Sequence, residues 1–217
     1  MRGELMPQIQ HDAKILVLPA TDLIEANDDA LVDALRAGDP RAPRVIWQRF
    51  AGLVYLVLRR SLGRPNDVED LAEEVFTNLL SRVAKLREPN SLPTFVVSIT
   101  SLTIRRELRR RWLRRWLRLD ADRNLGQEAR GLPSDPEQRQ ALARFYDILD
   151  RLSARDRIVF VLHFLAGMEL DEVAAALDLS LATAKRQATH ARALVEHRVG
   201  QDRALLGYLS GIDKEVA

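Results

Sequence analysis

The sequence of 217 residues contains no cysteine. This absence excludes a disulfide scaffold, a thiolate zinc site, an iron–sulfur cluster and a cysteine nucleophile. Long hydrophobic runs are missing too, since the longest uncharged apolar stretches, residues 51–58 and 158–168, fall far short of the roughly 20 residues that cross a bilayer. The first residues carry acids and lack an apolar core, so we expect no signal peptide and no membrane insertion.

Lysine is also scarce, since only four of the 33 basic residues are lysine and the rest are arginine. The net charge of the whole chain is only +2. The arginines are clustered: eight lie within residues 105–118, and Glu107 is the only acid among them. The cluster consists of Arg105, Arg106, Arg109, Arg110, Arg111, Arg114, Arg115 and Arg118. Such a local excess of positive charge is typical of a segment that binds a polyanion. Pairing of Glu107 with Arg111, one helical turn away, would absorb only part of it.

Strand-like alternation is confined to residues 13–20, whereas helical periodicity runs through the chain from Asp28 onward. We expect helices to begin at capping residues that include Asp28 or Asp29, Ser134, Ser153 and Ser180. The pattern predicts an all-α fold of two small helical domains joined by a flexible linker, the second containing a helix-turn-helix. The predicted boundaries are a flexible N-terminal arm (1–28), a first domain (29–118), a linker (119–134), a second domain (135–199) and a C-terminal tail (200–217).

The most regular helical pattern lies in residues 67–80, where an unbroken apolar stripe is set opposite acidic side chains. Five of the eight residues 67–74 are acidic. An acidic face favours docking on a basic protein surface, although acids near a helix N-terminus also occur on plain solvated faces. Carboxylates one turn apart could also hold a metal in a helical hydrolase or synthase, but a second acidic helix to complete such a site is missing.

Residues 169–195 have the layout of a helix-turn-helix. Asp178 occupies the turn and tolerates a left-handed backbone, and Ser180 is placed to cap the second helix. Small residues at 184, 188 and 191 are expected to pack inward. The outward side of the second helix offers hydrogen-bond donors suited to phosphates and base edges.

Two tryptophans, Trp112 and Trp116, lie one turn apart inside the arginine cluster. They could stack on unpaired bases, but such a pair more often packs in a core or between domains, and we expect packing here. His163 sits in an apolar helix and is expected to be a packed histidine rather than a metal ligand.

Taken in order, these segments resemble the bacterial RNA polymerase sigma factors, specifically the extracytoplasmic-function (ECF) group of the sigma-70 family. The resemblance covers about residues 29–199. Residues 67–76 resemble the helix that docks on the β′ clamp helices of core polymerase, which implies docking by Asp67, Asp70, Glu73, Glu74 and Phe76. Residues 91–111 lie where the family reads the −10 element, which implies DNA contacts by Arg105, Arg106, Arg109, Arg110 and Arg111. Residues 152–198 resemble the −35-binding region, which implies contacts by Ser180, Thr183, Lys185, Arg186, Gln187, Thr189, His190 and Arg192.

The resemblance implies a cytoplasmic bacterial transcription initiation factor that binds core RNA polymerase and directs it to promoter DNA. It implies no catalysis, no metal and no cofactor, and it makes an anti-sigma factor a candidate partner. The chain departs from the family pattern at several places around the −10 region: Phe95, Val96, Ser101, Leu102 and Arg106. The alternative function is a stand-alone helix-turn-helix regulator that binds duplex DNA without core polymerase.

Overall fold

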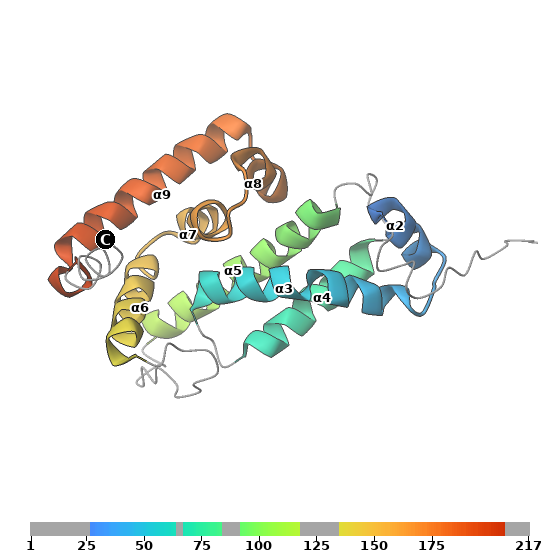
Figure 1. The fold of residues 1–217 in the computed structure, drawn as a ribbon, viewed down its shortest axis with the longest axis horizontal. Helices are drawn as coiled ribbons and strands as arrows, with labels where there is room; N and C mark the ends of the chain where they lie inside the picture. Colours follow the sequence, from blue (N-terminus) through green and yellow to red (C-terminus); the bar gives the residue numbers. More distant parts are fainter. Residues whose placement is uncertain (1–26, 64–66, 84–91, 118–134, 207–217) are drawn as a thin grey trace, which may run out of the picture.

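The computed structural model describes residues 27–63, 67–83, 92–117 and 135–206, and all regular secondary structure in these ranges is helical (Figure 1). The all-α prediction is confirmed. Residues 13–20 and the predicted linker lie outside the described ranges. The elements are α2 (Asp28–Arg36), α3 (Ala42–Leu62), α4 (Val68–Val83), α5 (Leu92–Trp116), α6 (Pro136–Leu149), α7 (Ala154–Phe160), the π-helical segment η2 (Val161–Leu165), α8 (Leu170–Leu177) and α9 (Leu181–Gln201).

Helix starts follow the capping chemistry of the sequence, with two shifts. Asn27, rather than Asp28 or Asp29, caps α2 by accepting a hydrogen bond from the backbone N–H of Ala30. Asp135 caps α6, whereas Ser134 lies outside the described residues. These shifts move the cap by one or two positions, which is the usual uncertainty of a helix boundary read from sequence.

The N-terminal helices pack around the apolar stripes of α3 and α4. Helices α3, α4 and α5 all contact one another, and α2 packs on α3. Val54, Leu58 and Val75 are completely buried, as are Leu79 and Ile104. This packing leaves the opposite sides of α4 and α5 available to carry their charged residues.

The C-terminal helices are in direct contact with the N-terminal ones. Ile158 of α7, Leu162 of η2 and Val173 of α8 belong to the same buried apolar cluster as the cores of α3, α4 and α5. Helix α5 lies against both α7 and α8 (Figure 1). Helix α6 also contacts α3, because the hydroxyl of Tyr146 in α6 donates to the carbonyl of Arg59 in α3 at 3.2 Å. In this arrangement one continuous core joins the two predicted domains.

A π-helical segment directs the chain from α7 into α8. The N–H of Ala166 donates to the carbonyl of Val161 at 2.7 Å, and Gly167 ends the helix with a positive φ of 76°. The half-buried His163 holds the turn, because its Nδ1 lies 2.8 Å from the carbonyl oxygen of Met168. This is the packing role predicted for that histidine.

Candidate polymerase and nucleic-acid interfaces

Helices α8 and α9 form the predicted helix-turn-helix. Asp178 adopts the left-handed conformation (φ 55°, ψ 52°), and the next N–H, that of Leu179, donates to the carbonyl of Ala174 at 2.8 Å. Ser180 caps α9 by accepting from the N–H of Thr183. The residues predicted to pack inward, Ala184, Ala188 and Ala191, are all buried. Their small size allows α9 to lie close to the helices beneath it.

The outward side of α9 divides the predicted −35 set into two groups. Lys185, Arg186, Thr189, His190 and Arg192 are exposed and lie on one face of the helix. Thr183 and Gln187 are only half-exposed, whereas Ser180 at the N-cap is exposed. Arg192 is paired with Glu196 at 2.6 Å. Within the described part of the chain, Lys185, Arg186 and His190 form no ion pair and are free to meet a ligand.

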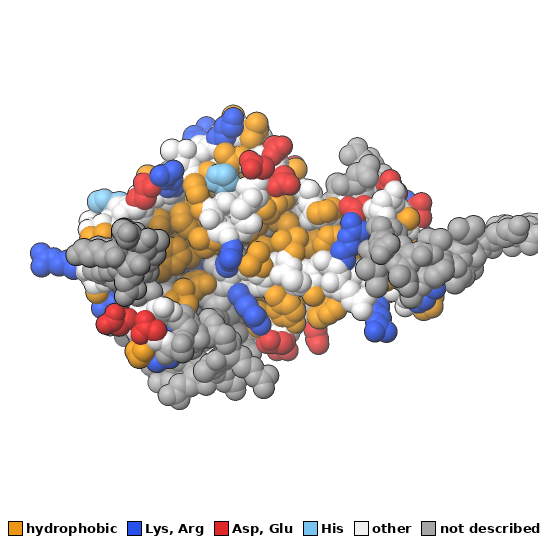
Figure 2. Space-filling view, in the orientation of Figure 1, with side chains coloured by type: hydrophobic (Ala, Val, Ile, Leu, Met, Phe, Trp, Pro, Cys, Tyr) orange, Lys and Arg blue, Asp and Glu red, His pale blue; other side chains and the backbone are white. Residues whose placement is uncertain are grey.

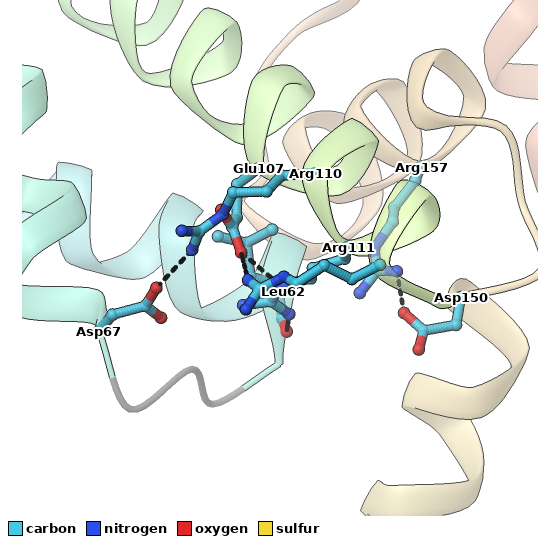
Figure 3. Close-up of polar contacts among 8 residues, drawn as sticks. Leu62, Asp67, Glu107, Arg110, Arg111, Asp150 and Arg157 are labelled. Atoms are coloured by element: carbon cyan, nitrogen blue, oxygen red, sulfur yellow. Dashed lines mark hydrogen bonds and ion pairs between the residues drawn. The ribbon is translucent and has the colours of Figure 1, made fainter. Parts of the chain in front are cut away.

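Three of the five arginines predicted to bind the −10 region form ion pairs within the protein, and Figure 3 shows two of them, Arg110 and Arg111. Arg106 pairs with Glu74 of α4. Arg110 binds Asp67 at 2.9 Å and Glu107 at 2.5 Å. Arg111 binds Glu107 at 2.8 Å and also donates to the carbonyl of Leu62, at the end of α3, at 2.9 Å.

Glu107 is the centre of this network, since its side chain is only 4% exposed. Burial opposes ionisation of the Glu107 carboxyl, but hydrogen bonds from Arg110 and Arg111 outweigh that effect and lower its pKa. Arg114 adds a more distant contact at 3.9 Å. The arginine cluster therefore stabilises its own domain in addition to carrying positive charge.

Arg105 and Arg109 are the two members of the set that form no ion pair with the described residues. Both are exposed. They line a cleft of about 810 Å³ between α5 and the turn from α6 to α7, together with Trp112 and the buried Arg157. Arg157 pairs with Asp150 (Figure 3). The free charge of α5 thus faces the C-terminal helices.

On α4 the structure separates the predicted docking residues in the same way. Asp67 and Glu74 are bound to α5. Phe76 is 4% exposed, so its ring cannot itself meet a partner. The exposed acids are Glu69, Asp70 and Glu73, which share the outward face of α4. Asp70 and Glu73 form no ion pair with the described residues, whereas Glu69 lies 3.9 Å from Arg59.

Comparison with known proteins supports one family along the chain. A model of sigma-70 region 2 matches residues 46–114, and a model of sigma-70 region 4 matches residues 136–195. The ECF RNA polymerase sigma-E factor of Haemophilus influenzae is 24% identical over 183 residues, which cover 81% of this chain and 96% of that protein. The solved structure of CnrH in complex with the cytosolic domain of CnrY matches with a TM-score of 0.59 and 25% identity, over 81% of this chain and 98% of that one.

The chain belongs to the ECF group of the sigma-70 family. It is a sigma factor, a transcription initiation factor that directs RNA polymerase to promoters. Its region 2 match covers most of α3, α4 and α5, and its region 4 match covers α6 to α8 and most of α9. The acidic helix and the helix-turn-helix lie inside these two matches, and the arginine cluster lies inside the first as far as Arg114.

The tryptophans of this sigma factor do not follow the packing expectation. Trp112 is 59% exposed and Trp116 is 68% exposed, so the prediction that they pack in a core or between domains is wrong. A third tryptophan, Trp47 of α3, has its ring against Phe76 and was not identified from sequence. Its signal was available, because Trp47 directly follows the buried stripe position Ile46 and therefore lies at the edge of that stripe.

The described ranges of this sigma factor contain no group of three His, Asp or Glu side chains arranged to hold a metal ion. None of the helices in those ranges is long and apolar enough to cross a membrane.

Proposed function

We propose that this sigma factor docks on core RNA polymerase through the exposed acids of α4: Glu69, Asp70 and Glu73. The observation that carries the proposal is the division on α4, where Asp67 and Glu74 are bound to α5 while these three face solvent. Surface carboxylates on one helix face suit a basic protein surface, and the β′ clamp helices are the partner that the family implies. Asp67 and Glu74 then serve to hold α5 against α4.

For promoter DNA we propose that α9 enters the −35 major groove and that α5 contacts the −10 region. The exposed face of α9 presents Lys185, Arg186, Thr189 and His190, which can donate to base edges and phosphates. On α5, Arg105 and Arg109 are free to bind phosphate, and the exposed Trp112 can stack on an unpaired base.

The arrangement of the helices implies that the chain opens on a promoter. The −10 and −35 elements lie about 25 base pairs apart, which is about 85 Å at 3.4 Å per base pair. Here Ser101, Leu102 and Arg105 of α5 line a groove together with Asp178 and Leu179 of the helix-turn-helix turn. Because one side of α5 faces the C-terminal helices, the C-terminal helices must move away from α5 before the chain can bind both promoter elements at once.

Fluorescence energy transfer tests this opening. The native chain has no cysteine, so dyes on Ser81→Cys in α4 and Ala193→Cys in α9 label two exposed positions selectively. We expect the transfer efficiency to fall sharply when core polymerase and promoter DNA are added. Unchanged transfer in an active promoter complex would contradict opening.

The structural relative CnrH was solved bound to the cytosolic domain of another protein, CnrY. By analogy, we propose that this sigma factor acts in the cytoplasm, performs no catalysis, and is held inactive by a protein of the anti-sigma class. A partner that stabilised the contact of α5 with α7 and α8 would keep the DNA-facing side of α5 covered.

Co-purification with bacterial core RNA polymerase tests the docking surface. The variant Asp70→Arg/Glu73→Arg should lose most binding, because two exposed carboxylates become positive against a basic partner. The matched control Glu137→Arg/Asp147→Arg makes the same charge change on exposed positions of α6 and should bind normally. Equal binding by both variants would reject α4 as the docking helix, and the stand-alone DNA-binding regulator would become the better explanation.

A further inference from the structure

An aromatic group borders the acidic face of α4. The ring of Trp47 lies 4.3 Å from that of Phe76 between centroids, and the ring of Tyr55 meets Trp47 edge-on at 6.4 Å. Trp47 remains 36% exposed, whereas Phe76 beneath it is buried. Phe76 therefore supports the Trp47 ring from below and holds an indole at the surface in a fixed position.

Tyr55 connects these rings to the acids. Burial raises the pKa of the Tyr55 hydroxyl, the carboxylates of Glu69 and Glu73 raise it further, and Arg59 opposes them. Tyr55 is thus within electrostatic reach of both exposed acids. The guanidinium of Arg59 lies over the Tyr55 ring at 5.3 Å and reaches Glu69 at 3.9 Å. In Figure 2, acidic side chains over α4 at the lower edge lie directly beside hydrophobic ones.

This combination differs from an ordinary core edge. A tryptophan that only completes the edge of a core needs neither a fixed, partly exposed ring nor carboxylates close by. Protein interfaces, in contrast, are anchored by a few aromatic side chains, Trp and Tyr above all, surrounded by polar residues. An anchor that is already ordered loses little conformational entropy on binding.

We propose that Trp47 and Tyr55 are the apolar anchor of the polymerase-docking surface, beside Glu69, Asp70 and Glu73. The inference rests on the proposed docking through α4 and extends it to α3. The partner is a basic helical surface of core polymerase that carries an apolar side chain among its cations, because the acids match its charge and the aromatic rings match its apolar position. Phe76 takes part as a positioning residue under Trp47.

Equilibrium binding of the fluorescently labelled full chain to bacterial core RNA polymerase tests the anchor. Trp47→Lys should weaken binding about 30-fold or more, the effect of removing a hot-spot residue, with added repulsion from a basic partner. Trp47→Glu should weaken binding less than Trp47→Lys, because its charge suits the partner. The matched control Leu206→Lys makes an apolar-to-lysine change at a residue of similar exposure, C-terminal to α9, and should stay within about twofold of the native chain.

The outcomes separate the anchor from the docking helix. Loss of binding in Asp70→Arg/Glu73→Arg with native binding by Trp47→Lys would overturn the anchor and leave docking through α4 intact. Native binding by both variants would overturn both proposals.

Folding of each variant is checked by its thermal unfolding midpoint. If Trp47→Lys does not fold, hydrogen exchange of the native chain decides. Addition of core polymerase should slow amide exchange in residues 47–59 of α3, and unchanged exchange there would reject the anchor.

Discussion

Helices α5 and α9 are both rich in basic side chains, yet their cations are in very different states. On α9, Lys185 and Arg186 face solvent and form no ion pair with the described residues. On α5, Arg106, Arg110 and Arg111 are bound to carboxylates of α4 or of α5 itself. Positive charge counted from a sequence is therefore a poor measure of the charge that is available to DNA.

The difference follows from what each helix packs against. Helix α9 buries alanines, so its polar face needs no internal partner. Helix α5 buries a carboxylate, Glu107, which would be costly without several donors. Arg111 also satisfies the carbonyl of Leu62 at the end of α3. Several basic side chains of α5 therefore stabilise the fold.

Removal of the buried carboxylate gives the largest effect that we expect in this comparison. Glu107→Gln should lower the free energy of unfolding by about 2 kcal/mol, because charge-assisted hydrogen bonds to Arg110 and Arg111 are lost. Urea denaturation followed by circular dichroism measures it. The control Glu196→Gln removes an exposed pair on α9 and should change stability by less than about 0.5 kcal/mol. Equal effects would mean that Glu107 does not hold α5.

The same variant predicts a pH dependence. The folded-state pKa of Glu107 lies below its ordinary value of 4.5, so its carboxylate stabilises the fold above that pH. This stability is lost as the pH falls toward the lowered value. The stability difference between the native chain and Glu107→Gln should therefore shrink between pH 6 and pH 3. A difference that stays constant over this range would contradict the assignment.

On α9 the comparison predicts a direct effect on promoter choice. If the unpaired guanidinium of Arg186 reads a base edge, Arg186→Ala should lower the free energy of discrimination between bases at one −35 position by about 1–3 kcal/mol. The holoenzyme should then accept other bases at that position. Binding of the reconstituted holoenzyme to a set of −35 variants measures this. Arg192→Ala is the matched control, because its guanidinium is already paired with Glu196 at 2.6 Å, and a smaller loss is expected. An unchanged preference in Arg186→Ala would remove its base-reading role.

Local features of the fold were predictable from sequence, whereas contacts between distant segments were not. Asp178 and Ser180 act within four residues of themselves, so their turn and cap were visible in the sequence. The pairing of Arg110 with Asp67 joins residues 43 positions apart, and no periodicity encodes it.

The candidate site shows the same limit. The acidic helix and its apolar stripe were found from sequence, and α4 carries both. That Phe76 lies beneath Trp47 depends on how α3 packs on α4, and the docking role that the family resemblance implied for Phe76 does not fit its buried ring. The exposed positions of Trp112 and Trp116 likewise depend on where the C-terminal helices lie.

The smallest expected effect is the most direct test of the comparison, because it sets two exposed arginines of one helix against each other. Arg105 has no ion pair with the described residues, whereas Arg110 binds Asp67 and Glu107. Each phosphate contact contributes about 0.9 to the slope of log K against log salt. Arg105→Ala should therefore reduce the slope of promoter binding by about 0.9, while Arg110→Ala should leave it nearly unchanged. If all five predicted arginines contacted phosphates, both variants would lose the same slope, and the internal ion pairs of α5 would have to exchange for phosphates on binding.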